Sequence, residues 1–265
     1  MLNLLKADLF ILRKSKVFKI SLGLMIVIIV GFSFTFSFND RVFEVSNIIR
    51  HNRMYGFAIG KVAENKDYIN FLRSSLGYTI FICVVMIFIV VDLVVSRYNN
   101  GTLRNTISYG HNRYKIYISN MLSIIIGVLA IALISIILSM VLLTILFIPD
   151  VRIKKLDVTT ISNVTITWTI IMVAMTSFYI MISTIVKNKT IITTWGVCFI
   201  VFISYSLFDK ISLRMQSKIP IYMILDICGQ PQNNTKLGIF IINSIIIFLI
   251  STIIGCIVFS NQEIK

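Results

Sequence analysis

Six apolar stretches, each long enough to cross a bilayer as a helix, constrain this chain more than any other feature of its sequence. They lie near residues 20–38, 76–95, 118–147, 164–186, 190–208 and 238–259. None shows the alternating pattern of roughly ten residues that marks a strand of a membrane barrel. Of the 265 residues, 57% are hydrophobic and only 14% are charged. The sequence therefore predicts an all-α polytopic membrane protein, a single domain over residues 1–265 with six transmembrane helices.

The distribution of basic residues predicts the orientation of these helices. Lys and Arg concentrate on the cytoplasmic side of short loops. With both ends inside (N-in/C-in), the cytoplasmic segments are 1–19, 96–117, 187–189 and 260–265, and these 50 positions hold 12 Lys and Arg. The three outer loops hold 13 in 82 positions. The raw count does not decide the orientation, whereas the density favours N-in/C-in, and the net charge of +14 then needs no nucleic-acid partner.

The first 19 residues are predicted to form a cytoplasmic interfacial helix. Four leucines at helical spacing share one face: Leu2, Leu5, Leu9 and Leu12. Basic residues surround the opposite face: Lys6, Arg13, Lys14 and Lys16. Such a helix lies in the headgroup layer, with its basic residues on anionic lipid. The same residues also suit a basic flank that orients the first span, and the two interpretations are compatible.

Four further segments have lengths that restrict the fold. Residues 187–189 leave so little slack that the fourth and fifth spans should form a tight antiparallel hairpin. The third span would reach about 45 Å, beyond a hydrocarbon core of about 30 Å, so it tilts or projects from the membrane. The apolar run 219–228 is too short to cross and suits a re-entrant or interfacial segment. The outer segment 39–75 is expected to contain surface helix.

The sequence shows no catalytic chemistry of its own. It has no Walker A loop, no HExxH or GxSxG motif and no close pair of carboxylates at helical spacing. The two histidines fall on opposite sides of the predicted membrane, and the four cysteines lack CxxC spacing, so the cysteines are interpreted as packing residues. We expect no enzyme activity, no metal and no cofactor in this chain.

Ionisable residues inside the predicted spans are equally sparse. Asp92 is the only acid in any of them, and it lies within one turn of the cytoplasmic end of the second span. Because intramembrane ionisable residues mark ion-coupled transport, a secondary transporter or channel is disfavoured. Hydroxyl residues are instead frequent in the fourth and fifth spans: Thr165, Thr167, Thr169, Thr176, Ser177, Ser183, Thr184, Thr190, Thr193, Thr194, Ser204 and Ser206. They either join helices by hydrogen bonds or form a weakly polar path for an amphipathic solute between subunits.

The basic segment 96–117, between the second and third spans, is the best place for this chain to receive work from another polypeptide. Gly101 supplies a flexible turn, Thr102 a good N-cap, and Gly110 a natural C-terminal stop for a helix of about two turns. Alone it is too short to be stable in water, so it needs a partner or the membrane surface.

The residues of this short helix predict a docking surface. Leu103 and Ile107 lie four positions apart, hence on one face, with Arg104 beside them. The helix therefore has an apolar tip and a basic rim, and the two apolar side chains are expected to face the partner.

An acid at the end of the second span and the residues after it form a longer pattern. Its members are Asp92; Asn100, Gly101, Thr102, Leu103, Arg104 and Asn105; Ile107, Ser108, Tyr109 and Gly110; and Arg113 followed by Ile116, Tyr117, Ile118 and Ser119. With this pattern, six spans and a basic N-terminal segment containing Asp8, the chain resembles the membrane subunit of ABC-2-type exporters. These short permeases are associated with export of, or immunity to, bacteriocins and other amphipathic peptides. Asn112 and Asn120 stand where the family usually has Ser and Lys.

The resemblance implies a permease subunit in a bacterial plasma membrane that pairs with a second permease, identical or different. The helix at 101–109 would sit in a groove of a separate ABC ATPase, which holds ATP and Mg. Closure of two ATPases would push through it and move an amphipathic peptide or similar toxic solute outward. Arg104 or Arg113 would anchor on ATPase carboxylates, or else be lipid-facing positive-inside charge. As the alternative function, a non-transporting immunity or sensor protein would bind a peptide at 39–75.

Overall fold

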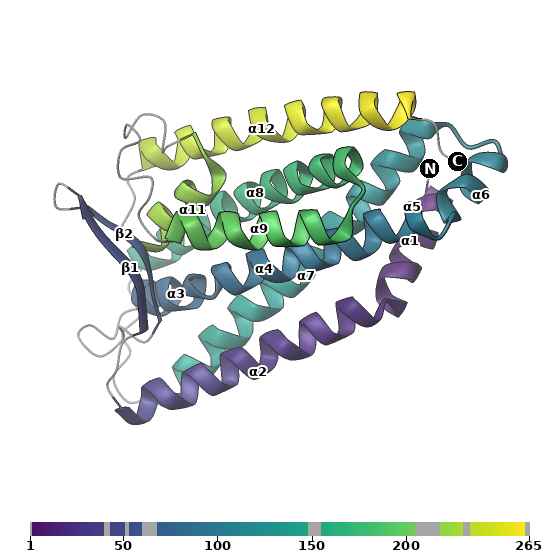
Figure 1. Cartoon of the computed structure of the whole chain (residues 1–265). Helices are drawn as coiled ribbons and strands as arrows, with labels where there is room; N and C mark the ends of the chain where they lie inside the picture. The colour runs from purple at the N-terminus through teal and green to yellow at the C-terminus, as the bar shows by residue number, and fades with distance from the viewer. Residues whose placement is uncertain are drawn as a thin grey trace.

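The computed structural model describes residues 2–39, 43–50, 53–59, 68–147, 155–204, 218–229 and 234–262. Most of these residues are helical, and the long helices run side by side along one elongated bundle (Figure 1). One end of the bundle holds the first helix and the last turn of the final helix, and we call it the termini end. The opposite end holds a two-stranded β-hairpin, and we call it the hairpin end.

The first half of the chain contains the hairpin and most of the short helices. Its elements are α1 (Leu2–Lys14), α2 (Lys16–Asn39), β1 (Phe43–Arg50), β2 (Arg53–Ile59), α3 (Tyr68–Gly77), α4 (Thr79–Val90), the π-helical turn η1 (Val91–Val95), α5 (Ser96–Asn99) and α6 (Thr102–Ser108). The second half is built mainly from long helices. They are α7 (Arg113–Phe147), α8 (Lys155–Val186), α9 (Lys189–Ser204), the short α11 (Pro220–Gly229) and α12 (Asn234–Asn261).

Five stretches of the described chain are helical, long and apolar enough to cross a membrane. They are Lys16–Phe34, Ser74–Asn99, Arg113–Leu146, Thr159–Val186 and Thr235–Asn261. This confirms the helical character expected of a multi-pass membrane protein. The sixth predicted span, 190–208, corresponds to α9, which is described for 16 residues as far as Ser204. The remainder of that span lies outside the described residues, so the six-helix count stays a prediction.

The outer segment 39–75 differs from the expectation of surface helix. Strands β1 and β2 pair antiparallel from Phe43 with Ile59 to Arg50 with Arg53, and α3 begins only at Tyr68. Both strands are rich in β-branched, aromatic and other large apolar residues, and only two residues separate them, which is the commonest length of a hairpin connection. The hairpin end therefore departs from an all-α fold.

The long helices form an inner and an outer group. In the inner stretches 74–99 and 159–186, 67% and 56% of the most apolar window is buried, against 22% in 16–34 and 17% in 235–261. α12 lies along α8, and α9 lies along α4. The exposed side of α12 is almost entirely isoleucine and leucine, as expected for a helix that faces hydrocarbon.

Predictions from segment length agree well with the structure. α7 spans 35 residues, about 50 Å at the rise of an α-helix, and is even longer than expected. A two-residue turn joins α8 to α9, with Lys187 at φ +53° and the Asn188 Oδ1 atom accepting a hydrogen bond from the backbone N–H of Thr190 at 3.0 Å. The short apolar run became α11, which is ten residues long, buried, and packed on α8 and β2.

Candidate functional site

The predicted docking helix is present as α6, Thr102–Ser108, at the termini end. Two glycines with positive φ delimit it: Gly101 at +67° before the helix and Gly110 at +80° after it. Left-handed backbone favours glycine at both places. The N-cap is Gly101 rather than Thr102, which is a correction. The Thr102 hydroxyl instead donates to the carbonyl oxygen of Arg97 at 3.3 Å and so fixes α6 against α5.

The apolar side of α6 faces the chain's own core. Leu103 is only 3% exposed, and Ile107 is partly buried against the same core. The expectation that Leu103 faces a partner is therefore wrong. A two-turn helix must bury its apolar side to be stable, and here the adjacent helices cover it. Replacing both residues by Ala would consequently test folding and docking at once.

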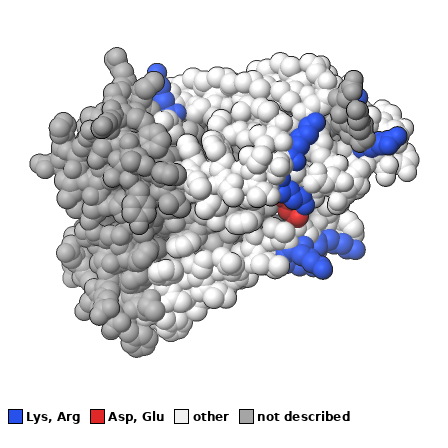
Figure 2. Space-filling view, viewed as in Figure 1, with Lys and Arg blue, Asp and Glu red and all other residues white. Residues whose placement is uncertain are grey.

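The outward side of α6 is polar and aromatic. Arg104, Asn105 and Ser108 are exposed, and Tyr109, which follows the helix, is 82% exposed. On the face seen in Figure 2, Lys and Arg gather mainly toward the termini end, while the middle of the bundle shows neither charge. An exposed aromatic beside an arginine is the kind of pair that dominates protein–protein contacts.

A buried ion pair connects the docking segment to the first helix. The Arg97 Nη1 atom lies 2.7 Å from Asp8 Oδ1, and the two side chains are only 12% and 11% exposed. The Ser119 hydroxyl of α7 donates to the other carboxylate oxygen at 2.6 Å. Three segments far apart in sequence thus meet at one carboxylate, which needs these donors because an unpaired buried charge is costly.

The span-end acid, Asp92, binds a second group of hydroxyls. Its carboxylate accepts hydrogen bonds from Ser15, between α1 and α2, at 2.8 Å and from Ser96 at 3.4 Å. Asp92 lies in the π-helical turn η1, where the helix widens by one residue per turn. Such π-bulges occur frequently at functional sites. The acid therefore ties the end of α4 to the start of α2.

The last turn of α12 is bound to the same end. Arg113 Nη1 donates to the carbonyl oxygens of Ser260 and Gln262 at 2.8 and 2.7 Å. The side chain of Gln262 accepts from the Tyr98 hydroxyl at 3.1 Å and donates to the carbonyl of Thr184 at 2.8 Å. Arg113 thus serves the chain's own C-terminal segment, whereas Arg104 points outward.

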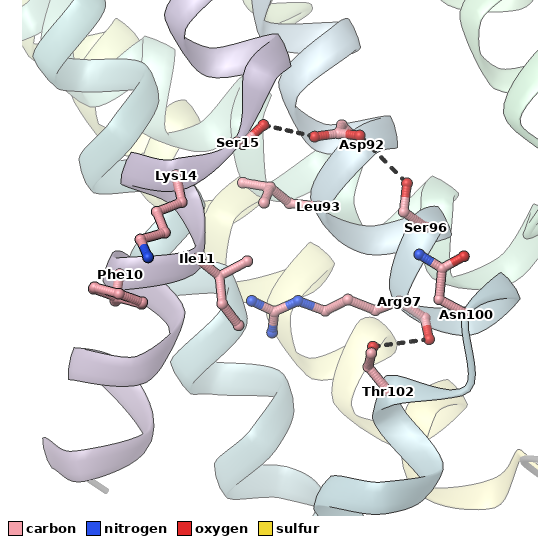
Figure 3. A pocket seen from close by; sticks show the side chains of 10 residues that line it. All are labelled: Phe10, Ile11, Lys14, Ser15, Asp92, Leu93, Ser96, Arg97, Asn100 and Thr102. Atoms are coloured by element: carbon pink, nitrogen blue, oxygen red, sulfur yellow. Dashed lines mark hydrogen bonds between the residues drawn. The ribbon is translucent and has the colours of Figure 1, made fainter.

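A cleft opens between α1 and the η1–α5–α6 segment (Figure 3). Its volume is about 400 Å³. Its lining residues are Phe10, Ile11, Lys14, Ser15, Asp92, Leu93, Ser96, Arg97, Asn100 and Thr102. The figure shows the Arg97 side chain reaching from α5 toward Ile11, with the Lys14 ammonium beside Phe10. Polar and apolar side chains thus meet in one opening.

Most hydroxyls of α8 and α9 bond within their own helix. Thr165, Thr167, Ser183 and Thr194, for example, each donate to a carbonyl four residues earlier. Bonds between helices are fewer in the described residues, and the Ser177–Ser251 pair at 2.7 Å is one of them. Helix–helix bonding therefore explains only part of this group, and the path between subunits stays a prediction.

Sequence reasoning found α6 and Asp92 but missed the residues that hold them. Asp8, Arg97, Ser119 and Gln262 carry the contacts, and none was predicted as a site residue. One signal was available: Asp8 lies on the same helical face as Leu12, so an acid interrupts the apolar stripe of α1. The predicted stripe through Leu2 is also corrected, because Leu2 is 74% exposed and the buried face contains Asp8 and Leu12.

No cluster of metal-ligating side chains occurs among the described residues. The four cysteines are unpaired. Burial raises the pKa of the Cys228 thiol, outside the candidate spans, to about 12, which fits a packing role. Comparison with models of known protein families finds no match for this chain. Comparison with curated proteins finds none either.

Proposed function

We propose that this chain is the membrane-spanning permease subunit of an ATP-driven ABC exporter, coupled to a separate ATPase through α6. The observation that carries the proposal is the construction of α6: its apolar side is fixed in the bundle while Arg104 and Tyr109 point outward. A polar face held rigidly by buried contacts is preorganised for a protein partner. The resemblance of residues 92–119 to ABC-2 permeases names the class of that partner.

The contacts around α6 offer a route for mechanical work. Thr102 joins α6 to α5, Arg97 joins α5 to α1 and, through Asp8, to Ser119 of α7. Arg113 joins the start of α7 to the end of α12. A push on α6 would therefore move several long helices together rather than bend one loop. The cargo that fits this chemistry class is an amphipathic peptide or a similar toxic solute, moved out of a bacterial plasma membrane.

The test compares two charge reversals at the termini end. Arg104→Glu changes the exposed face of α6, and Lys115→Glu changes an equally exposed position on α7. The full chain is purified in mild detergent with its associated ATPase, and ATP hydrolysis and recovery of the complex are measured. We expect Arg104→Glu to weaken recovery of the ATPase about tenfold, as the loss of one charged hydrogen bond at an interface would, and Lys115→Glu to leave recovery nearly unchanged.

Equal recovery of an ATPase with wild type and Arg104→Glu would contradict docking through Arg104. Failure of any ATP-hydrolysing chain to bind the wild type would favour the alternative, a peptide-binding immunity or sensor protein. ATP-independent uptake that follows an ion gradient would instead favour a secondary transporter.

A further inference from the structure

The cleft between α1 and the η1–α5–α6 segment contains cationic donors that lack an acceptor. Nε and Nη2 of Arg97 are buried, and neither has a hydrogen-bond partner in the part of the chain that the structure describes. Only Nη1 is used, by Asp8. Buried guanidinium donors are normally satisfied, so an acceptor is missing at this place.

Lys14 is a second cation in the lining without a carboxylate partner. Its ammonium lies 4.6 Å from the centre of the Phe10 ring. Within the described residues no ion pair joins Lys14 to Asp92, although both line the cleft. A lysine held over an aromatic ring at the mouth of a cleft remains available to bind an anion.

The acids near the cleft are already satisfied. The Asp92 carboxylate accepts hydrogen bonds from Ser15 and Ser96, and Asp8 accepts from Arg97 and Ser119. The unsatisfied groups of the cleft are therefore donors, which favours an anionic ligand over a cationic one.

The apolar part of the wall indicates what carries the anion. Phe10 is 58% and Ile11 48% exposed, and both lie on α1 next to Lys14. The cleft also lies where the charged termini end meets the apolar middle of the bundle (Figure 2). A phospholipid has the matching arrangement, with a phosphate beside acyl chains.

We propose that this cleft binds a phosphate group, that of a phospholipid headgroup, with Lys14 and Arg97 as its cationic contacts and Phe10 and Ile11 against the acyl chains. Asn100 and Thr102, which also line the cleft, supply further polar contacts. The bound lipid would lie between α1 and α6, and its presence does not depend on an ATPase. The site thus stands or falls independently of the proposed transport function.

The test uses the full chain, stripped of lipid in mild detergent, and measures binding by native mass spectrometry. The probes are dioctanoyl-phosphatidylglycerol, inorganic phosphate, and dioctanoylglycerol, which lacks the phosphate. Lys14→Gln removes the cleft cation, and Arg13→Gln is the matched control, because Arg13 is exposed on the same helix outside the cleft. We expect Lys14→Gln to weaken binding of the phosphatidylglycerol about tenfold, Arg13→Gln less than about twofold.

A second variant, Arg97→Lys, keeps a cation for Asp8 but removes the guanidinium donors. It should bind the phosphatidylglycerol about tenfold more weakly than wild type. Its thermal unfolding reports whether the bundle is intact, and if it does not fold, the Lys14→Gln result alone decides.

The probes separate the two sources of phosphate. Lipid is the ligand if the phosphatidylglycerol binds more tightly than inorganic phosphate, and soluble phosphate is the ligand if the order is reversed while Lys14→Gln still weakens binding. Equal losses in Lys14→Gln and Arg13→Gln, or equally tight binding of dioctanoylglycerol, would overturn the site.

Discussion

The termini end and the middle of the bundle use polar side chains in different ways. At the termini end, Asp8, Asp92 and Gln262 join segments separated by 77 to 164 residues in sequence. In the middle, hydroxyls such as those of Thr165 and Ser183 return to carbonyls of their own helix. The first arrangement fixes how elements sit relative to one another, whereas the second only satisfies a polar group locally. The termini end is therefore where displacement of one element must move the others.

The largest effect is expected from breaking the buried ion pair. Asp8→Asn leaves the Arg97 charge buried without its carboxylate, and this should lower the free energy of unfolding by about 3–5 kcal/mol. The measurement is thermal or denaturant unfolding in detergent, followed by the fluorescence of the buried Trp168. In the double variant Asp8→Asn, Arg97→Gln the losses should fall well short of additive. Additive losses would mean that the pair does not act as a unit.

A smaller and more local effect is expected at the C-terminal contact. Gln262→Ala removes the bonds to Tyr98 and Thr184 and should cost about 1–2 kcal/mol, since two hydrogen bonds are lost at a partly buried place. Because these bonds hold α5, hydrogen exchange should speed up in the amides of α5 and α6. The matched control is Asn261→Ala, at an exposed neighbouring position. Faster exchange of equal size in both variants would contradict a specific contact.

The smallest effects are expected in the middle of the bundle. Ser177→Ala removes the interhelical bond to Ser251 and should cost about 0.6 kcal/mol. Thr165→Val removes only a bond to the carbonyl of Ile161 and should change stability by less still. Unfolding measured side by side ranks the two. If Thr165→Val were as damaging as Asp8→Asn, the contrast between the two regions would not hold.

Much of the helical architecture follows from the sequence because apolar length and glycine placement are local signals. The long helices, the two-residue turn before α9 and the limits of α6 at Gly101 and Gly110 could all be predicted in this way. The β-hairpin could not, because its apolar and charged residues fit neither period regularly. Helix α9 is shorter in the described chain than the apolar run that predicted it.

The candidate site was less predictable because its contacts are long-range. The pattern of α6 showed an apolar face at Leu103, but not whether that face meets a partner or the chain's own core. The bonds of Asp8 to Arg97 and Ser119 span 89 and 111 residues, and no periodicity reports such a pairing. An acid in an apolar stripe signals that a partner exists without naming it. Only the packed bundle identifies Arg97 as that partner.

The most direct test of the account is site-specific photocrosslinking from position 109 in the full chain in its native membrane. Tyr109 is 82% exposed beside α6, and Leu249, 51% exposed on α12, is the matched control far from that surface. With a photoreactive residue at 109, the account predicts an adduct with a separate ATP-hydrolysing chain, lost when Arg104→Glu is added and absent from position 249. No such adduct from 109, or the same adduct from 249, would contradict the proposal that α6 is where this protein receives work.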